Sequence, residues 1–535
     1  MMIKPVLTGI LFIFLSVNLF SQNTFDYSIE LVPVYIPELP GLHSYAFGQH
    51  DGKWLIIGGR KDGLHARQPF SSFLQEHNNT DIYVIDVNSQ QFWNASVNVL
   101  TNGLKEQLQS TNMNFYQDND TLYIIGGYAY SETTGNHITF PNLTSVQVSS
   151  LVDAVIAGNN ITPFFKQMTS DIFAITGGQL GKIDDTFYLI GGHRFDGRYN
   201  PMNNPTFQQA YSNQIRKFTI NNSETQLSFL NYSVITDPIH LRRRDYNLLP
   251  QIFPDGTEGY TISSGVFQAG ADLPFLYPVD ITASGYSPVT DFNQYLSHYH
   301  SAKATLYDSV RNEMHSLFFG GMSQYYYKDR ALIKDDLVPF VKTISRLTRY
   351  ANGTLEEFQL PAEMPGLKGA SAEFIPNNSL PHYASEIIKL NKVPQDEFII
   401  GHIFGGISSP SLNPFTNNQT NTTKADPSVY AVKLIKNKPS TAYKIDGKNP
   451  YNIHVYPNPV SKAFTIEFNL DKMMMCHYFL TNSSGQIISE GIINPAQAGN
   501  NRKTIRLEKD LPPQTLFLTV VFDNLYFVTK KIVRK

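Results

Sequence analysis

Several polar side chains follow short apolar stretches that end in glycine, where a loop would begin. Arg60, Arg194 and Tyr325 come soon after such glycines, and His193 stands immediately after one of them. Arg244 ends a run of three arginines that precedes another apolar stretch. A guanidinium group can hold a carboxylate through two hydrogen bonds, and a tyrosine ring can stack on a sugar or a peptide. These residues predict a ligand-binding site if their loops converge; the alternative for each one is a solvated loop residue.

Other chemistries find less support. His298 and His300 would point to one face of an extended strand, where two imidazoles can bind a metal, but no carboxylate is spaced to complete a triad. We therefore predict structural roles for both histidines and a solvated loop for Asp335 and Asp336. Cys476 is the only cysteine, which excludes an intramolecular disulfide and a multi-thiolate metal site. Phosphate-binding glycine loops, metalloprotease helices and nucleophile elbows are absent from the sequence. We predict no metal and no cofactor.

The composition points to an all-β protein of more than one domain. The chain has 535 residues, of which 13% are aromatic and only 16% are charged. Tyrosine and phenylalanine are frequent in pleated, half-buried strands, whereas surface helices need more charge. The formal net charge of −3 supplies no field for attracting a polyanion, so nucleic acid is not an expected partner.

A repeat organises the first four-fifths of the chain. Six times an apolar stretch runs into a glycine pair or its remnant, and the second glycine recurs at intervals of 68, 65, 73, 56 and 85 residues. A glycine at the end of a strand allows a positive φ and lets neighbouring backbones approach closely. The repeat glycines are Gly58, Gly59, Gly126, Gly127, Gly191, Gly192, Gly265, Gly320, Gly321, Gly405 and Gly406.

A second strand is expected after each glycine pair. Its start lies 22, 18, 21, 10, 22 and 22 residues beyond the second glycine. The unit is therefore a strand, a glycine pair, a loop and another strand. The expected second strands are DIYVIDV from Asp81, SVQVSSL from Ser145, NQIRKFTI from Asn213, FLYPVDI from Phe275, TISRLTRY from Thr343 and SVYAVKLI from Ser428.

These units resemble kelch repeats, in which a strand ending in Gly-Gly precedes a strand with Tyr and Asp and then a Trp. The first unit matches best, with Gly58-Gly59, Tyr83, Asp86 and Trp93. The resemblance implies a β-propeller over residues 26–437, with ligands met by loops at one mouth of the ring.

The last repeat leaves no room for an outer strand of its own. Residues 27–36 (YSIELVPVYI), ahead of the first repeat, are strand-like and have no other place. We therefore predict that they complete the sheet of the last unit and close a ring of six blades. Seven blades stay possible if a long loop contains a further unit.

The N-terminal residues have the layout of a signal peptide. Lys4 precedes an apolar stretch over residues 7–20, and the small Ser21 follows it. The stretch is shorter than the ~20 residues that span a bilayer, and no basic stop-transfer residues come after it. We predict a signal peptide over residues 1–21 and no membrane span in the mature chain. The scarcity of cysteine favours a bacterial envelope over an animal secreted module.

A second domain is expected at the C-terminal end. From residue 444 onward there are 12 Lys and Arg against 7 Asp and Glu, a net charge of +5 that leaves −8 for the rest. Short alternating strands fill this segment and predict a β-sandwich over residues 450–535, after a linker at residues 438–449.

This segment resembles the sorting domain that cargo proteins of the type IX secretion system of Bacteroidota carry at their C-terminus. The matching residues are Tyr456, Pro457, Asn458, Pro459, Gly485, Lys530 and Lys531. The resemblance implies type IX secretion machinery as a partner and a secreted or cell-surface protein.

Two functions follow as expectations. The first is a secreted or surface-attached propeller that binds an extracellular glycan, peptide or protein through its loop-rich face. The second is a sugar epimerase or mutarotase without a metal, because some kelch propellers isomerise sugars with acid and base side chains at the mouth. An enzyme should show a channel with a titratable group of perturbed pKa beside an arginine, and a binder an open polar and aromatic surface.

Overall fold

The computed structural model describes residues 25–202, 206–329, 331–436, 442–508 and 510–535, and these residues form an all-β fold. Two α-helices interrupt the strands, α1 (Asn102–Leu108) and α2 (Val148–Ala157). No helix within the described ranges is long and apolar enough to cross a membrane. The expected signal peptide lies outside the described residues, as does the expected linker before residue 442.

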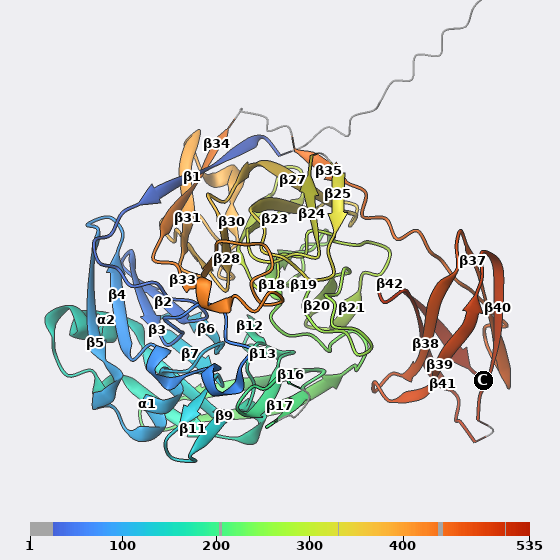
Figure 1. Ribbon diagram of the computed structural model, residues 1–535, viewed down its shortest axis with the longest axis horizontal. Helices are drawn as coiled ribbons and strands as arrows, with labels where there is room; N and C mark the ends of the chain where they lie inside the picture. Colours follow the sequence, from blue (N-terminus) through green and yellow to red (C-terminus); the bar gives the residue numbers. More distant parts are fainter. Residues whose placement is uncertain (1–24, 203–205, 330, 437–441, 509) are drawn as a thin grey trace, which may run out of the picture.

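Six antiparallel sheets follow one another around the molecule (Figure 1). Each is built on four strands, in chain order in the first five sheets, and the first strand given below for each sheet is called here the inner strand. The first three sheets contain β2 (Ala46–His50), β3 (Lys53–Ile57), β4 (Asp81–Asp86) and β5 (Gln91–Ser96); β6 (Asn114–Asp118), β7 (Thr121–Ile125), β10 (Asn142–Gln147) and β11 (Phe165–Thr169); and β12 (Gln179–Ile183), β13 (Thr186–Ile190), β16 (Gln214–Asn222) and β17 (Leu227–Thr236).

The other three sheets are also built on four strands, with two differences. The fifth sheet gains a strand at each edge, and the last takes its outer strand from the N-terminal end. They contain β18 (Asn247–Ile252), β19 (Glu258–Ser263), β20 (Val279–Thr282) and β21 (Gly285–Pro288); β22 (Ala302–Asp308), β23 (Glu313–Phe319), β26 (Thr343–Arg349) and β27 (Leu355–Glu363), edged by β30 (Ile388–Lys389) and β35 (Tyr443–Ile445); and β29 (Glu373–Pro376), β31 (Glu397–Phe404), β34 (Val429–Lys436) and β1 (Tyr27–Val34).

Short strands lie in the loops between the second and third strands of several sheets, and one of them, β28, lies between the fifth sheet and the sixth. They pair as β8 with β9, β14 with β15, β24 with β25, and β28 with β32 and β33. Their bounds are β8 (Tyr128–Ser131), β9 (Asn136–Thr139), β14 (His193–Gly197), β15 (Phe207–Tyr211), β24 (Tyr325–Lys328), β25 (Ala331–Lys334), β28 (Leu367–Ala370), β32 (Ile407–Ser409) and β33 (Lys424–Ala425).

Two of the strands expected after a glycine pair differ from the structure, in which they are the third strands of their sheets. The segment from Ser145 is a strand only as far as Gln147, because apolar residues at helical spacing then begin α2, which ends at the left-handed Gly158. In the fourth unit the strand begins at Val279 rather than at Phe275. Pro278 precedes it and has no N–H to donate to a neighbouring strand.

The hydrophobic core lies between neighbouring sheets. Leu55 of the first sheet and Leu122 of the second belong to one buried cluster, and Leu317 of the fifth and Ile403 of the sixth to another. The second strand of each sheet, which leads into the glycine pair or its remnant, is therefore covered on both faces. This explains why these strands are continuous apolar runs and not alternating ones. The first and last sheets also share a cluster, which contains Ile56 and Phe404.

A closed ring of backbone hydrogen bonds joins the six sheets at one end. Each ring residue lies two positions before an inner strand and has a positive φ of 32° to 65°. Each N–H donates to the carbonyl oxygen of the ring residue of the adjacent sheet, at 2.6 to 3.2 Å. The donors and acceptors run from Ser44 to Ser371, Ser371 to His300, His300 to Asp245, Asp245 to Gly177, Gly177 to Asn112 and Asn112 to Ser44.

The glycine pairs allow adjacent sheets to meet at this end. A Cβ on Gly126 would lie 1.8 Å from the carbonyl oxygen of Ile175, and one on Gly405 would lie 2.1 Å from that of Leu42. Both glycines also have a positive φ, +70° and +69°. The second glycine of the last pair, Gly406, donates its N–H to Leu42 at 2.8 Å and so links the last sheet to the first. Close approach explains these glycines.

The predicted closing strand is confirmed. β1 pairs with β34 over eight residues, from Tyr27 opposite Lys436 to Val34 opposite Val429. It is the outer strand of the last sheet, as the sequence indicates for residues 27–36.

The C-terminal segment forms two further sheets with their own core, at one side of the molecule (Figure 1). One contains β36 (His454–Tyr456), β37 (Ala463–Leu470) and β40 (Gly499–Arg506); the other contains β39 (Ile487–Ala496), β38 (Met474–Asn482), β41 (Gln514–Phe522) and β42 (Tyr526–Arg534).

This C-terminal unit also contacts the fourth sheet. The ring of Phe527 lies 4.9 Å from that of Tyr277, centroid to centroid, and both belong to one buried cluster. Asn449, at the end of the expected linker, donates to the carbonyl oxygen of Phe527 at 2.9 Å. Strand β35, within the same linker, pairs with β27 of the fifth sheet. The described part of the linker is therefore bonded to the sheets.

Candidate functional site

A cavity of about 830 Å³ runs along the centre of the six sheets. Its wall includes residues of all six inner strands, and the ring residues Ser44, Asn112, Gly177, Asp245 and His300 form its floor. At the other end the lining residues Asp184, Glu258, Ala283 and Glu386 are exposed. The volume suits a small ligand, which would enter from this second end.

Three titratable groups meet at the floor. His300 Nε2 lies 3.6 Å from the carboxylate of Glu373, and Asp245 is bonded to the guanidinium of Arg244. Tyr299 donates its hydroxyl to Asp245 at 3.0 Å. Burial alone would raise the pKa of Asp245, but the charge of Arg244, together with smaller contributions from His300, His193 and the Tyr299 hydroxyl, holds this pKa below its usual value. The floor therefore keeps a charged carboxylate and a histidine–carboxylate pair in one place.

The wall carries tyrosines and further charged groups. Tyr260 accepts the backbone N–H of Lys182 at 2.8 Å and forms a side-chain hydrogen bond with Tyr116. Burial, with the negative charge of Glu386, raises the pKa of both tyrosines, so both stay protonated donors. The Lys182 ammonium pairs with Asp118 at 2.7 Å. These groups can hydrogen-bond a polar ligand along the length of the cavity.

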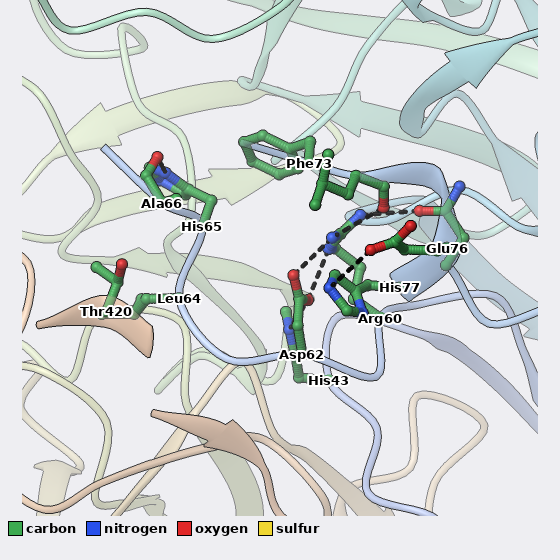
Figure 2. A network of polar contacts seen from close by, with 12 residues as sticks. His43, Arg60, Asp62, Leu64, His65, Ala66, Phe73, Glu76, His77 and Thr420 are labelled. Carbon is green, nitrogen blue, oxygen red and sulfur yellow. Dashed lines mark hydrogen bonds and ion pairs between the residues drawn. The ribbon is translucent and has the colours of Figure 1, made fainter. Parts of the chain in front are cut away.

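Arg60 is buried beyond the ring and is already bonded. Its guanidinium donates to Asp62 at 2.8 and 2.6 Å and to Asn78 at 2.8 Å, and it lies 5.4 Å from the ring of Phe73. Figure 2 shows Arg60 pointing at Asp62, with His43 beside that carboxylate. Burial would raise the pKa of Asp62, but His43 and Arg60 lower it well below its usual range. Arg60 is thus held as the centre of a polar network.

His193 and Arg244 lie close to each other and to Asp245 of the cavity floor. Burial, reinforced by the charge of Arg244, lowers the pKa of His193 to about 3, so this histidine is neutral. The Arg244 guanidinium donates to the hydroxyl of Tyr211 at 3.0 Å and lies 5.0 Å from the ring of Phe267. Burial, reinforced by the charges of Arg244 and then Arg60, lowers the pKa of His65 to about 4. Both arginines are therefore near His65.

Arg194 and Tyr325 are placed differently. Arg194 is half-exposed, and its guanidinium contacts Asp196 at 2.6 Å and Asp171 at 3.7 Å. Tyr325 is buried, with its ring 4.9 Å from that of Tyr295. The structure thus brings Arg60, Arg244 and His193 around the ring end, and it turns Arg194 and Tyr325 to other neighbours.

Aromatic side chains from separate loops gather beyond the ring. His65 stacks on Phe73 at 4.9 Å and meets the edges of Tyr199 at 4.5 Å and Phe415 at 5.4 Å. Arg67 lies 5.5 Å from the ring of Phe415 and donates to the carbonyl oxygen of Thr416. These loops belong to the first, third and sixth sheets, and they cover the ring end of the cavity.

The paired histidines of the sequence have separate neighbours. His298 is fully buried between the carbonyl oxygen of Gly320, at 2.7 Å, and the hydroxyl of Ser345, also at 2.7 Å. His300 belongs to the ring and faces Glu373. Their φ angles of 43° and 32° are far from extended, so the two side chains do not share a strand face.

Four candidate residues that the sequence did not single out come from an inner strand, a second strand and loops. Asp245, Glu373, Tyr260 and Glu386 all line the cavity. Only the spacing of the ring residues could have indicated the floor, because each of them precedes an inner strand by two positions. The ring residues otherwise share no side-chain type.

The predicted motif residues of the C-terminal unit are brought together. The Asn458 side chain donates to the carbonyl oxygen of Lys531 at 3.0 Å and accepts the N–H of Val533 at 2.9 Å. Tyr456 donates its hydroxyl to Glu467 at 2.6 Å. Gly485, with φ of +80°, closes the turn between β38 and β39. The first motif and the basic C-terminal strand therefore form one structure.

Residues 454–535 match the family model described as "Secretion system C-terminal sorting domain". This domain is a type IX sorting domain. Its presence indicates export through the type IX secretion system, to the medium or to the cell surface. The sorting domain implies the machinery of that system as a partner.

The rest of the chain has no comparable match by sequence. No curated protein sequence matches the chain. Among solved structures, "Structure of YjhT" aligns at 12% identity with a TM-score of 0.41, over 75% of this chain and 99% of that one. At this level the alignment carries no information on function.

Proposed function

We propose that residues 26–437 form a six-bladed, kelch-type β-propeller that binds a ligand after export by the sorting domain. The six sheets are its blades. Three features support this reading: the repeated strand order, the hydrogen-bond ring with one residue from each sheet, and the contacts of β1 and Gly406 that join the last sheet to the first. In a ring of blades every inner strand faces one channel, as the inner strands here do.

The observation that carries the binding role is the central cavity. It is large enough for a small molecule or one sugar unit, and its wall combines tyrosines with charged groups. Arg244 acts in this reading through the floor, where it fixes Asp245, whereas Arg60 fixes Asp62 beside His43 beyond the ring. His193, Arg194 and Tyr325 remain candidates for contacts on the loop-covered face.

The test is an array of glycans and peptides probed with the chain covering residues 25–535. Ala384 is an exposed residue of the cavity wall, so Ala384→Trp should block the cavity and abolish binding of the ligand found. Val310→Trp is the matched control, because Val310 is 81% exposed on a turn away from the cavity. Binding that Ala384→Trp leaves unchanged would move the site to the loops or to the sorting domain.

The second candidate is a sugar epimerase or mutarotase. The observation that favours it is the pair formed by His300 and Glu373 at the end of a channel, with Asp245 and Arg244 beside it. Two titratable groups that face one ligand can remove and return a proton. Proton NMR of reducing sugars would reveal faster exchange between anomers or epimers. Glu373→Gln should abolish that exchange and keep binding; a binding module would show no exchange at all.

A further inference from the structure

The cavity carries an excess of negative charge. Its described lining includes six carboxylates, those of Asp118, Asp184, Asp245, Glu258, Glu373 and Glu386. It includes two lysines, Lys182 and Lys303. The formal charge of these eight groups is therefore −4, half of the excess of −8 that the sequence gives to the whole chain before residue 444.

Two of the three positive groups at the cavity are already paired. Lys182 is paired with Asp118 at 2.7 Å, and Arg244, behind the floor, is paired with Asp245. Lys303 forms no ion pair among the described residues, and its charge and that of His382 partly offset the effect of burial, which raises the pKa of Glu386. Asp184 and Glu258 at the open end have no such neighbour among the ion pairs of the described residues. The field along the cavity therefore favours a cation.

The floor adds uncharged acceptors that lack a donor. Asn114 is 1% exposed, and its Nδ2 donates to the carbonyl oxygens of Ile125 and Ile175, both at 3.0 Å. These two bonds fix the orientation of the amide, and they leave its Oδ1 without a hydrogen-bond partner in the described chain. The Oδ1 of the ring residue Asn112 also has no hydrogen-bond partner in the described chain. A buried acceptor without a donor is costly, and a bound N–H group would satisfy it.

Aromatic rings complete the wall. Phe47 and Phe115 both line the cavity, with their rings 5.2 Å apart, and Tyr116 and Tyr260 follow along the same wall. Aromatic faces attract organic cations, and hydrated metal ions gain much less from them. Within the described residues no three His, Cys, Asp or Glu side chains converge as metal ligands. Charge, acceptors and rings together suit an organic ammonium.

We infer that the central cavity binds a small organic cation, in which an ammonium group donates to the acceptors of the floor and the carbon skeleton lies against the aromatic wall. This inference rests on the proposed binding role of the cavity. The ligand is of amino-sugar or alkyl-diamine size, because the cavity holds about 830 Å³.

Calorimetry with matched probes tests the charge requirement. Glucosamine, N-acetylglucosamine and glucuronate share one ring and differ in charge, and cadaverine and 1,5-pentanediol form a second matched set. The chain covering residues 25–535 should bind glucosamine or cadaverine at least about tenfold more tightly than the neutral and anionic partners. Added salt should weaken this binding. Equal affinities, a preference for glucuronate, or no measurable binding of either cation would overturn the inference.

Variants test whether the carboxylates of the cavity wall account for cation binding. The double variant Glu258→Gln/Glu386→Gln removes two exposed carboxylates of the wall and should lower the affinity for the cation about tenfold. Glu224→Gln, on an exposed turn outside the cavity, is the control and should leave the affinity unchanged. An equal effect of both changes would show a general charge effect and overturn the inference.

Ala384→Trp separates this inference from the proposed function. A neutral ligand that this variant displaces would leave the binding role standing and refute the cation. A ligand that the variant does not displace would refute both.

Discussion

The backbone N–H of Ser44 donates a hydrogen bond of 3.0 Å to the carbonyl oxygen of Ser371. Ser44 precedes the first inner strand and Ser371 the last one, so this bond joins the two ends of the repeat. Five of the six ring residues are not glycine, and a left-handed conformation costs roughly 1–2 kcal/mol for such a residue. The closed ring of bonds offsets this cost, since each N–H that enters it is satisfied.

Gly405→Ala should destabilise the protein strongly. Gly405 has φ of +69°, and a Cβ there would lie 2.1 Å from the carbonyl oxygen of Leu42, in the segment that leads into the first sheet. The control is Gly256→Ala, because Gly256 has φ of +84° but no atom within 4 Å of the added Cβ. We expect a loss of about 1 kcal/mol for the control and at least about twice that for Gly405→Ala in urea unfolding. Equal losses would show that φ alone explains this glycine.

Deletion of residues 26–36 should open the last sheet. β1 covers β34 over eight paired residues, and its loss would leave the N–H and C=O groups of a long strand unpaired. We expect a lower melting temperature and aggregation measured by light scattering. Tyr35→Ala is the control, because Tyr35 is 74% exposed and lies beyond the last pair. An unchanged melting temperature after the deletion would refute the closing role of β1.

The sequence predicted the strands better than the site. The glycine pairs and the apolar runs before them located the second strand of each sheet, because close packing between neighbouring sheets requires both. The closing strand was also predictable, since residues 27–36 had no other partner. The ring was not, because it depends on a backbone angle that Ser, Asn, Asp and His adopt without a common side-chain signal.

The predicted site residues show why loop residues are difficult to interpret. Arg60 follows a glycine pair as expected, yet Asp62, two positions later, binds its guanidinium. Tyr325 is buried in a cluster that includes Leu525 of the sorting domain, and no sequence pattern could indicate this contact across 200 residues. The cavity residues come from six different sheets, so only the folded ring brings them together.

The stability of the protein should depend on the protonation of Glu357. This side chain is fully buried and accepts the N–H groups of Tyr295 and Leu296 at 2.9 and 3.0 Å. Burial outweighs these two bonds and raises the pKa of Glu357 to about 8, from 4.5. The folded state therefore binds this proton more tightly than the unfolded state. Its stabilising contribution is complete below pH 4.5 and is lost as the pH rises to about 8.

Glu357→Gln removes this titration and is the means to measure it. The free energy of unfolding of the native chain should fall relative to that of the variant by up to about 1.4 kcal/mol per pH unit between pH 5 and about pH 8. Urea unfolding at four pH values measures the difference. Glu224→Gln, on an exposed turn, should give a difference that does not change with pH. A constant difference for Glu357→Gln as well would contradict the raised pKa.

The contact between the sorting domain and the fourth sheet should be separable from the fold of the sheets. Phe527→Ala removes the ring that packs on Tyr277 and leaves a cavity in a shared cluster. We expect a loss of roughly 3 kcal/mol in the stability of the sorting domain and its contact, with the six sheets unchanged. Tryptophan fluorescence reports on the sheets, because Trp54 and Trp93 both lie in the first one. A matching shift of the tryptophan signal would show that the two parts unfold as one.

Export should require the sorting domain. Removal of residues 453–535 takes away all of its sheets and keeps β35 and the bonds of residues 447–449 to the fifth sheet and its loop. The truncated chain should fold and accumulate in the periplasm, because the type IX machinery has no domain to bind. Cell fractionation of the native host measures this, and fusion of residues 444–535 to an unrelated periplasmic protein is the matching gain-of-function control.

In the intact chain we expect proteolytic release of roughly ten kilodaltons during surface delivery, which corresponds to a domain of this length. The cut would uncover Tyr277 and Phe275, just before strand β20 of the fourth sheet, since both pack on Phe527. Normal appearance of the truncated chain in the medium or on the surface would refute the sorting role and make the C-terminal sheets an ordinary binding domain.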